Sequence, residues 1–350
     1  MKRTRAYDTL ADDMRPIRIC LVGGGLIWEQ VHRRNLQRHN DRFVVSGICA
    51  RSGETRKGVV KDFPDVREYT SIEELFDRRS VEHYDALLVL TPIPLNASVA
   101  IRGLERGKMV FVEKPVAMSE AECAALEVAS RRAAVPLYIL ENNAYDSRFR
   151  TTAELVAAGR IGTPVSARRV THLFLGGDRN QAGEYGSSKW RAAPDYPLGI
   201  VFDGGIHDLA GLRAIAGTVE TVFADGRSLR EGFGEYDWIH TVLNYRSGFV
   251  ASFSHSSAMP SSANETVVYG TDGTIEFSNK GVRLTDIDGE TSELETDGTP
   301  NHDLMWDALA AAATDLRDAE YIPSDGIADV RTLLAIERSI HTRRAEFVGA

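Results

Sequence analysis

Cysteine is scarce in this chain. Only three are present among 350 residues, Cys20, Cys49 and Cys123, and each lies in an apolar segment. An odd, scattered set does not indicate a disulfide framework, and it lacks the paired spacing of a zinc site. The sequence therefore predicts three small core residues in a reducing compartment, with no bound metal.

Excess positive charge and long apolar runs are also lacking. The chain has 41 Lys and Arg against 50 Asp and Glu, a formal net charge of -9. Without a basic stripe, nucleic acid is not expected as a partner. No apolar run reaches the length of a membrane span, and the first fifteen residues lack the apolar core of a secretion signal. We therefore expect no membrane association and a cytoplasmic location.

What the chain does have is enough apolar sequence, 43%, for two domains of ordinary size. Between residues 17 and 140, short apolar runs alternate with helical patterns, two of which open with capping boxes at Ser71 and Ser119. Uniformly apolar strands between helices are typical of a parallel, doubly wound Rossmann sheet covered on both faces. The expected strands are Ile17–Val22, Phe43–Ile48, Ala86–Leu90, Met109–Val112 and Leu137–Leu140.

After about Asn142 the pattern changes to strands separated by glycine turns, with hairpin signals at 245–248 and 271–273. This half predicts a mixed, mostly antiparallel sheet with helices on one face. The expected strands are 165–174, 221–224, 238–245, 249–254, 265–269, 274–277 and 281–285, and the expected helices are 148–158, 202–215, 302–317 and 326–342.

Three consecutive glycines, Gly23 to Gly25, follow the first strand and open a helix. In that context the backbone amides of a helix N-terminus, including those of Leu26 and Ile27, can hold a dinucleotide pyrophosphate. Trp28 stands where the G-x-G-x-x-G pattern has its third glycine, so we expect a displaced helix or a remodelled turn. A plain strand–helix turn is the alternative.

The end of the second strand faces the adenosine ribose in such folds. Arg51 and Ser52 stand there, and a guanidinium with a hydroxyl suits a 2′-phosphate. The pattern favours NADP over NAD, although Arg51 can also be an exposed loop charge and Glu54 supports NAD. Thr91 and Pro92, after the 86–90 strand, are expected on the nicotinamide side.

Two further patterns indicate catalysis. Glu113-Lys114-Pro115 follows a buried strand, and a lysine there is fixed at the sheet edge where α/β proteins bind ligands. Asp203 and His207 are four residues apart on an expected helix, so they share one face, and Gly204-Gly205 between them leave room for a ligand. A histidine can transfer a proton and an aspartate can orient it. The alternative is a pair that only supports the helix.

These motifs together resemble the glucose–fructose oxidoreductase, inositol dehydrogenase and rhizopine-catabolism (Gfo/Idh/MocA) family. The resemblance runs in family order from about residue 16 to the C-terminus. Ile93 and Asn96 depart from it, because the family often has Asn and His at those positions. The matching motifs are the glycine turn ending in His32, Thr91-Pro92, Glu113-Lys114-Pro115, Trp190-Arg191 and Asp203-x-Gly205-x-His207.

The resemblance implies an extension at 1–16, a Rossmann domain at 17–141 and a substrate-binding and oligomerisation domain at 142–350, whose last helices can pack back on the first. The second domain would carry a large open sheet that forms a homodimer or homotetramer. The implied reaction is NAD(P)-dependent hydride transfer with a sugar, cyclitol or related polyol. Two alternatives stay open: a glycoside hydrolase or lyase with transient NAD redox, and a non-catalytic NAD(P)-sensing regulator.

The resemblance also implies roles for individual residues. The catalytic set would be Lys114, Asp203 and His207, which with Tyr145 and Trp190 would bind substrate; Asp237 is a further candidate for the pocket. The expected cofactor contacts are Gly23, Gly25, Leu26, Ile27, Arg51, Ser52, Thr91, Pro92, Asn96, Glu113, Lys114 and Arg191.

Overall fold

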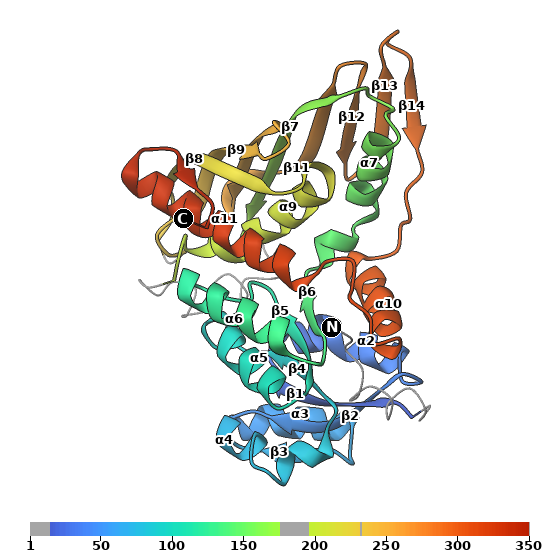
Figure 1. Cartoon of the computed structure of the whole chain (residues 1–350), viewed down its shortest axis with the longest axis vertical. Helices are drawn as coiled ribbons and strands as arrows, with labels where there is room; N and C mark the ends of the chain where they lie inside the picture. The colour runs from blue at the N-terminus through green and yellow to red at the C-terminus, as the bar shows by residue number, and fades with distance from the viewer. Residues whose placement is uncertain (1–14, 176–195, 232, 350) are drawn as a thin grey trace. The chain divides into compact units, whose positions relative to one another are not determined.

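The computed structural model describes residues 15–175, 196–231 and 233–349, which form two units (Figure 1). The first unit comprises the chain up to Glu141 together with His302–Ile327. The second comprises Asn142–Asn301 and the segment from Ala328 onward. No helix in the described ranges is long and apolar enough to cross a membrane.

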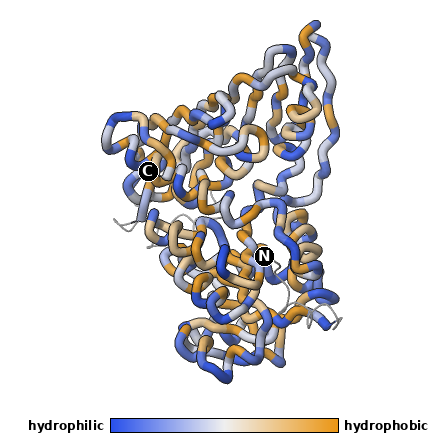
Figure 2. Tube along the Cα trace, viewed as in Figure 1, coloured by the Kyte–Doolittle hydropathy of each residue, from blue (hydrophilic) through white to orange (hydrophobic). Residues whose placement is uncertain are grey.

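The first unit is built on a six-stranded parallel sheet in the order β3-β2-β1-β4-β5-β6. This confirms the doubly wound Rossmann fold. The central strands β4 and β5 are buried along their whole length and form part of the hydrophobic stretches in Figure 2. The strands are β1 (Ile17–Gly23), β2 (Phe43–Cys49), β3 (Arg67–Tyr69), β4 (Ala86–Leu90), β5 (Met109–Glu113) and β6 (Leu137–Leu140).

Two helices of this unit begin at the serines that the sequence marks. The Ser71 hydroxyl accepts a hydrogen bond from the Glu74 amide, and the Ser119 hydroxyl accepts one from the Glu122 amide, which confirms both N-caps. The Glu74 and Glu122 carboxylates in turn accept from the backbone N–H one residue before each serine. The helices are η1 (Trp28–His32), α2 (Arg33–Arg38), α3 (Gly53–Asp62), α4 (Ile72–Leu75), η2 (Ser80–His83), η3 (Ile93–Leu95), α5 (Asn96–Glu105), α6 (Glu120–Arg132) and α10 (Asn301–Thr314), followed by the start of α11 (Pro323–Thr342).

Successive residues of β5 pack against helices on opposite faces of the sheet, because side chains alternate along a strand. A β-carbon at Gly103 of α5 would lie 2.9 Å from the Val110 side chain. The next residue, Phe111, stacks on Trp306 of α10 with 5.8 Å between ring centroids. Glu113 follows Phe111 by two positions and therefore points to the Trp306 side.

The second unit is built on a nine-stranded sheet in the order β14-β13-β12-β11-β7-β10-β9-β8-β15. Only β7 and β10 pair in parallel; the other neighbours are antiparallel, which confirms the predicted mixed sheet. The strands are β7 (Pro164–Phe174), β8 (Val219–Arg227), β9 (Trp238–Tyr245), β10 (Val250–Ser256), β11 (Ala258–Gly270), β12 (Gly273–Ser278), β13 (Gly281–Asp286), β14 (Thr291–Leu294) and β15 (Glu346–Phe347).

Helix α9 (Ile200–Ala216) packs against strands β9 and β10. It also contacts the short helix η4 (Asn142–Tyr145) and helix α7 (Ser147–Ala157), which follows η4 in the chain. Leu198 and Gly199 enter α9 with positive φ angles of 53° and 55°. A β-carbon at Gly199 would lie 2.7 Å from the Phe233 carbonyl oxygen, so this turn requires glycine. It fixes where the first turn of α9 begins.

Candidate active site

The glycine turn at the end of β1 packs closely at Gly23 and is open at Gly25. Gly23 has a φ of 92°, and a β-carbon there would lie 2.4 Å from the Leu90 carbonyl oxygen, so this position requires glycine. Gly25 is exposed, and no described atom lies within 4 Å of where its β-carbon would be. Leu26 and Ile27 follow in the first helical turn, where amides lack acceptors within the helix. The turn therefore fits a dinucleotide pyrophosphate.

Trp28 remodels the helix that starts at this turn. It is fully buried against Phe63, with 6.0 Å between ring centroids, and begins the π-helix η1. The widened turn is closed by the Arg33 amide, which donates to the Trp28 carbonyl oxygen. The predicted remodelling is thus confirmed, because a wider helical turn accommodates an indole where a third glycine would allow close packing.

The loop after β2 presents Arg51 and Ser52 at the N-terminus of α3. The Ser52 hydroxyl accepts from the Thr55 amide as the helix cap, with 3.3 Å between the atoms, and can still donate its own proton. Arg51 is exposed. Arg56, which sequence reasoning missed, donates to the Ala50 and Arg51 carbonyl oxygens. Arg56 therefore shapes the loop that carries Arg51.

Thr91 and Asn96 hold the turn that contains Lys114. The Thr91 hydroxyl donates to the Asn96 side-chain oxygen at 2.8 Å. The Asn96 amide donates to the Glu113 carbonyl at 2.9 Å and to the Pro115 carbonyl at 3.0 Å, so it braces the chain on both sides of Lys114. The Lys114–Pro115 peptide bond is cis. Cofactor contacts from Asn96, Thr91 and Pro92 stay predictions.

Glu113 is buried beside Lys114 and is bonded at both carboxylate oxygens. One oxygen lies 2.7 Å from Nε2 of His32, and the other accepts the Lys114 backbone N–H at 3.0 Å. Burial opposes ionisation, but the His32 hydrogen bond and the nearby positive charge of Lys114 outweigh it and lower the Glu113 pKa. Glu113 is therefore an ionised acceptor.

In the second unit, Asp203 and His207 occupy successive turns of α9, as predicted. Asp203 is buried in the first turn, where the helix dipole favours a carboxylate, and His207 is half-buried. Tyr145 is fully buried at the end of η4. Trp190 and Arg191, like most of the extension at 1–16, lie outside the described residues. Lys114 belongs to the first unit, so its action together with Asp203 and His207 stays a prediction.

Two expectations about the second unit were wrong. Gly204 does not leave room for a ligand, because the His255 ring occupies the space beside it. A β-carbon at Gly204 would lie 2.7 Å from His255 Nε2. Asp237 is fully buried, and its carboxylate accepts from the Leu229 and Arg230 amides. Gly204 therefore serves the packing of α9, and Asp237 holds a turn.

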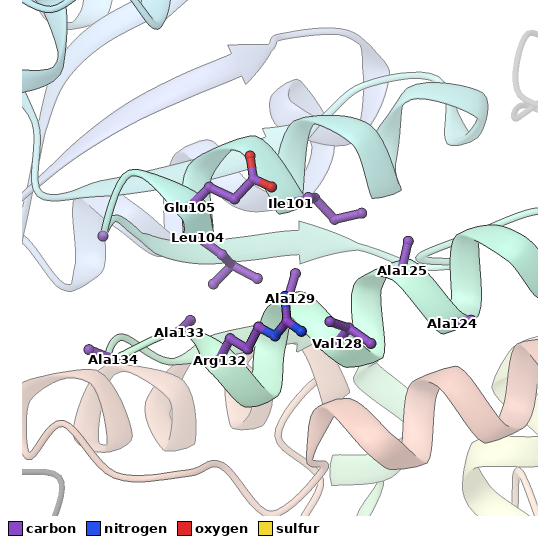
Figure 3. Close-up of a pocket in the computed structure, with 11 residues that line it drawn as sticks. Ile101, Leu104, Glu105, Ala124, Ala125, Val128, Ala129, Arg132, Ala133 and Ala134 are labelled. Carbon is purple, nitrogen blue, oxygen red and sulfur yellow. The ribbon is translucent and has the colours of Figure 1, made fainter.

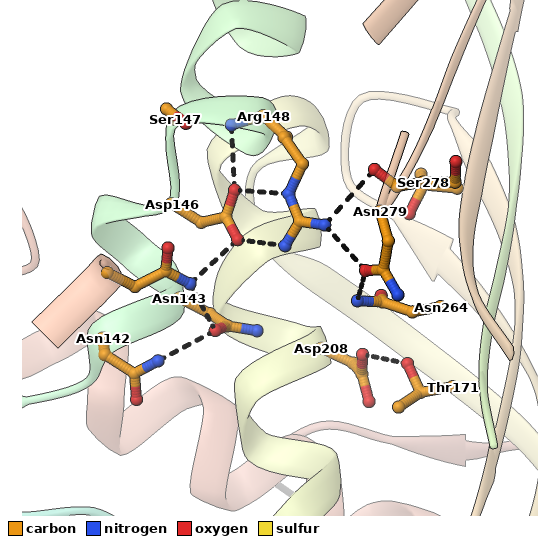
Figure 4. A network of polar contacts seen from close by, with 12 residues as sticks. Asn142, Asn143, Asp146, Ser147, Arg148, Thr171, Asp208, Asn264, Ser278 and Asn279 are labelled. Carbon is orange, nitrogen blue, oxygen red and sulfur yellow. Dashed lines mark hydrogen bonds and ion pairs between the residues drawn. The ribbon is translucent and has the colours of Figure 1, made fainter. Parts of the chain in front are cut away.

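Asp208, which the sequence did not mark, anchors α9 to the sheet. Its carboxylate accepts from Arg169 Nε at 2.7 Å, from the Thr171 hydroxyl at 2.6 Å and from His255 Nδ1 at 2.9 Å (Figure 4 shows Asp208 and Thr171 beside the separate Asp146–Arg148 network). Burial opposes ionisation, but the Arg169 charge and the His255 hydrogen bond hold the Asp208 pKa well below its usual range. This cluster sets the position of the helix that carries Asp203 and His207.

We expect Asp208→Asn to lower the free energy of unfolding by about 3–5 kcal/mol near neutral pH, because the buried Arg169 loses its counter-charge. Since the folded-state pKa of Asp208 is depressed, its stabilisation is present above the ordinary carboxyl pKa of about 4 and is lost as the pH falls below it. Urea unfolding of both proteins along a pH series measures the difference.

The matched control is Glu276→Gln, which breaks an ion pair with Arg283 whose two side chains are 41% and 48% exposed. Exposed pairs contribute about 1 kcal/mol or less, so this change should be small at every pH. An equal effect of the two substitutions would contradict the anchoring role of Asp208.

Figure 3 shows a groove between α5 and α6 of the first unit. Ile101 and Leu104 line it from α5, and Val128 and Ala129 line it from α6. None of its lining residues belongs to the glycine turn, the ribose loop or the Lys114 turn. The groove is therefore not the dinucleotide site.

A parallel sheet in this strand order, with a glycine turn at its carboxyl edge, is typical of proteins that bind dinucleotides. The class is thus a dinucleotide-binding Rossmann protein. The chain belongs to the Gfo/Idh/MocA family: residues 17–140 match the oxidoreductase family NAD-binding Rossmann fold, and residues 149–276 match the GFO/IDH/MocA C-terminal domain.

Relatives with known names support this membership. The chain is 29% identical to myo-inositol 2-dehydrogenase of Thermotoga maritima over 80% of this chain and 78% of that protein. It is 23% identical to the NADP+-dependent scyllo-inositol 2-dehydrogenase of Bacillus subtilis over 88% and 77%. A crystal structure of a Thermotoga maritima oxidoreductase shares the fold, with a TM-score of 0.85, 23% identity, and coverage of 95% of this chain and 99% of that one.

Proposed function

We propose that this enzyme transfers a hydride between NADP and a carbinol carbon of a sugar, cyclitol or related polyol. The observation that carries the proposal is Lys114, a cation held at the carboxyl edge of a dinucleotide-binding sheet by Asn96 and Glu113. The two relatives named as inositol dehydrogenases support the substrate class.

When bound, the nicotinamide supplies the hydride acceptor or donor. In our proposal Lys114 donates a hydrogen bond to the substrate oxygen and stabilises the negative charge that develops on it. His207 accepts the hydroxyl proton during oxidation and returns it during reduction. Asp203 binds a neighbouring hydroxyl and offsets the positive charge of the other two residues. Their joint action on one substrate is part of the proposal.

A panel of sugars and polyols, each tested with NADP and with NAD by nicotinamide absorbance, tests the reaction. We expect at least one cyclitol or sugar to change the absorbance. A glycoside that releases its aglycone with no net change in nicotinamide would instead favour the hydrolase alternative. No turnover with any compound, combined with tight cofactor binding, would favour the regulator.

For the cofactor, we expect Arg51→Ala to weaken NADP binding by about 10- to 100-fold and NAD binding far less. The reason is that a guanidinium–phosphate contact is charge-assisted and exists only with the 2′-phosphate. Fluorescence titration with both cofactors measures the two dissociation constants. Lys61→Ala, which removes an exposed cation of α3, is the control and should alter neither. Equal weakening of both cofactors by Arg51→Ala would contradict the NADP preference.

We further propose that the open face of the large sheet forms a homodimer or homotetramer. Val250 and Tyr269 are both paired with Ser166 across the sheet and are 36% and 42% exposed, and Phe223 on β8 is 49% exposed. The register places these apolar side chains on one face, opposite the face on which Ala251 and Phe253 are buried. Sedimentation equilibrium should give two or four chains; a monomer would contradict the proposal.

A further inference from the structure

We infer that Trp306, His32 and Glu113 form a hydrogen-bonded relay that positions Lys114, with Trp306 fixing which nitrogen of His32 carries the proton. The inference rests on the proposed role of Lys114. All four residues belong to the first unit, although Trp306 comes from α10, far along the chain.

The relay is buried and continuous. Trp306 Nε1 lies 3.1 Å from His32 Nδ1, and His32 Nε2 lies 2.7 Å from a Glu113 carboxylate oxygen. The other carboxylate oxygen accepts the Lys114 backbone N–H at 3.0 Å. Trp306 and His32 are fully buried, and Glu113 is 9% exposed. Each member therefore has a fixed partner within the protein.

The indole ring is held in place by its neighbours. It packs edge-on against Phe43 and stacks on Phe111, with 5.9 Å and 5.8 Å between ring centroids. On the surface of the unit, Asp303 and Asp307 of α10 pair with Arg34 and Arg38 of α2. These ion pairs join α10 to α2, and Figure 1 shows the two helices side by side.

The chemistry of the three groups determines the proton positions. An indole nitrogen can only donate, so His32 Nδ1 must accept and carries no proton. The proton of the neutral ring then lies on Nε2, which donates to Glu113. Glu113 thus faces two donors, His32 Nε2–H and the Lys114 amide, and an ionised carboxylate matches both because it only accepts. This explains why Glu113 is an acid at this position.

The relay acts on Lys114 through its backbone. Glu113 holds the Lys114 amide, while Asn96 holds the carbonyls of Glu113 and Pro115 on either side. Lys114 is therefore aimed from a backbone fixed at three points. Trp306, His32 and Glu113 are positioning residues in this scheme, and a packing role for the indole is the alternative that the test must exclude.

The test uses the mismatch that Glu113→Gln creates. A glutamine side chain has one acceptor, its oxygen, and one donor, its NH2 group, but it faces two donors, His32 Nε2–H and the Lys114 amide. As long as Trp306 keeps the His32 proton on Nε2, one of these two donors has no acceptor. We expect kcat to fall by about 10- to 100-fold. In Glu113→Gln/Trp306→Phe, His32 is free to move its proton to Nδ1 and accept from the glutamine NH2, which restores the match to the Lys114 amide. The losses from the two substitutions should therefore be far from multiplicative, with the double variant more active than Glu113→Gln alone.

The control is Tyr84→Phe, which also removes a buried aromatic donor of the same unit: the Tyr84 hydroxyl donates to the Leu75 carbonyl oxygen at 2.9 Å. Tyr84→Phe combined with Glu113→Gln should show multiplicative losses. If Trp306→Phe combined with Glu113→Gln also shows multiplicative losses of kcat, the indole serves packing alone and the relay is overturned.

Side-chain nitrogen NMR of the full chain with ¹⁵N-labelled histidine gives a readout that needs no substrate. A His32→Gln variant identifies the His32 signals. We expect the Nε2–H form of His32 in the unaltered protein and in Glu113→Gln, and a switch to Nδ1–H only in the double variant. A protonated Nδ1 in the unaltered protein overturns the relay, even if the variants do not fold. Absence of turnover with every polyol would instead count against the proposed function, and the two failures are thus distinguishable.

Discussion

Replacing Lys114 by alanine is expected to lower kcat by about a thousandfold or more while NADP binding changes little. In our proposal Lys114 supplies the positive charge at the oxygen that becomes an alkoxide, and a preorganised donor of this kind contributes mainly in the transition state. In the same proposal the pyrophosphate and adenosine ribose contacts lie at the glycine turn and the Arg51 loop, so most cofactor contacts are retained when the Lys114 side chain is removed. Steady-state kinetics and cofactor titration of the same preparation separate the two effects.

Lys108 provides a matched control because it stands just before the amino end of the same strand, β5. Its ammonium donates to the Tyr84 carbonyl oxygen at 2.9 Å, and burial lowers its pKa. Lys108→Ala therefore removes a partly buried lysine of the same unit and should leave kcat within about twofold. Full activity in Lys114→Ala would remove Lys114 from the mechanism.

The second large effect is expected for His207→Ala, with kcat lowered by about 100- to 10,000-fold. His207 transfers the hydroxyl proton in our proposal, so its loss leaves the substrate oxygen without a proton acceptor. Added imidazole should restore part of the activity, since a free base can occupy the vacated space. Kinetics with and without imidazole at constant pH measure this rescue.

His240→Ala is the matched control for that experiment. His240 is exposed on β9 of the same unit, so its removal should change neither kcat nor the response to imidazole. If His207→Ala loses activity but imidazole restores none and the protein is also less stable, His207 supports the helix, and proton transfer must be assigned elsewhere.

The fold was largely predictable because buried parallel strands are continuous apolar runs. Five of the six strands of the first sheet were located this way, all five to within one residue at each end. The missed strand β3 has only three residues, of which Arg67 and Glu68 are exposed, so it carries no hydrophobic signal. Strand β14 was missed for the same reason, because three of its four residues are exposed and polar, and β15 was missed because it has only two residues.

Whether a residue of the candidate site could be predicted depends on how far along the sequence its partners lie. Lys114, Asp203 and His207 were identified because each sits in a short local pattern. The His32–Trp306 and Asp208–His255 contacts join residues 274 and 47 positions apart, and no local pattern reports such a pairing. The error at Gly204 has the same origin, since only the folded chain shows which side chain fills the space a glycine leaves.

The position of Trp306 has a consequence for synthesis. All six strands of the first sheet have been made once Leu140 is added, but the indole that covers Phe43 and Phe111 follows only after Asn142–Asn301, the larger part of the second unit. At ordinary translation rates this interval is roughly 10–30 s. During it, the nascent sheet exposes an aromatic face and His32 lacks its donor. The growing chain therefore has an aggregation-prone surface that chaperones can bind, and the Lys114 turn gains its final support only near the end of translation.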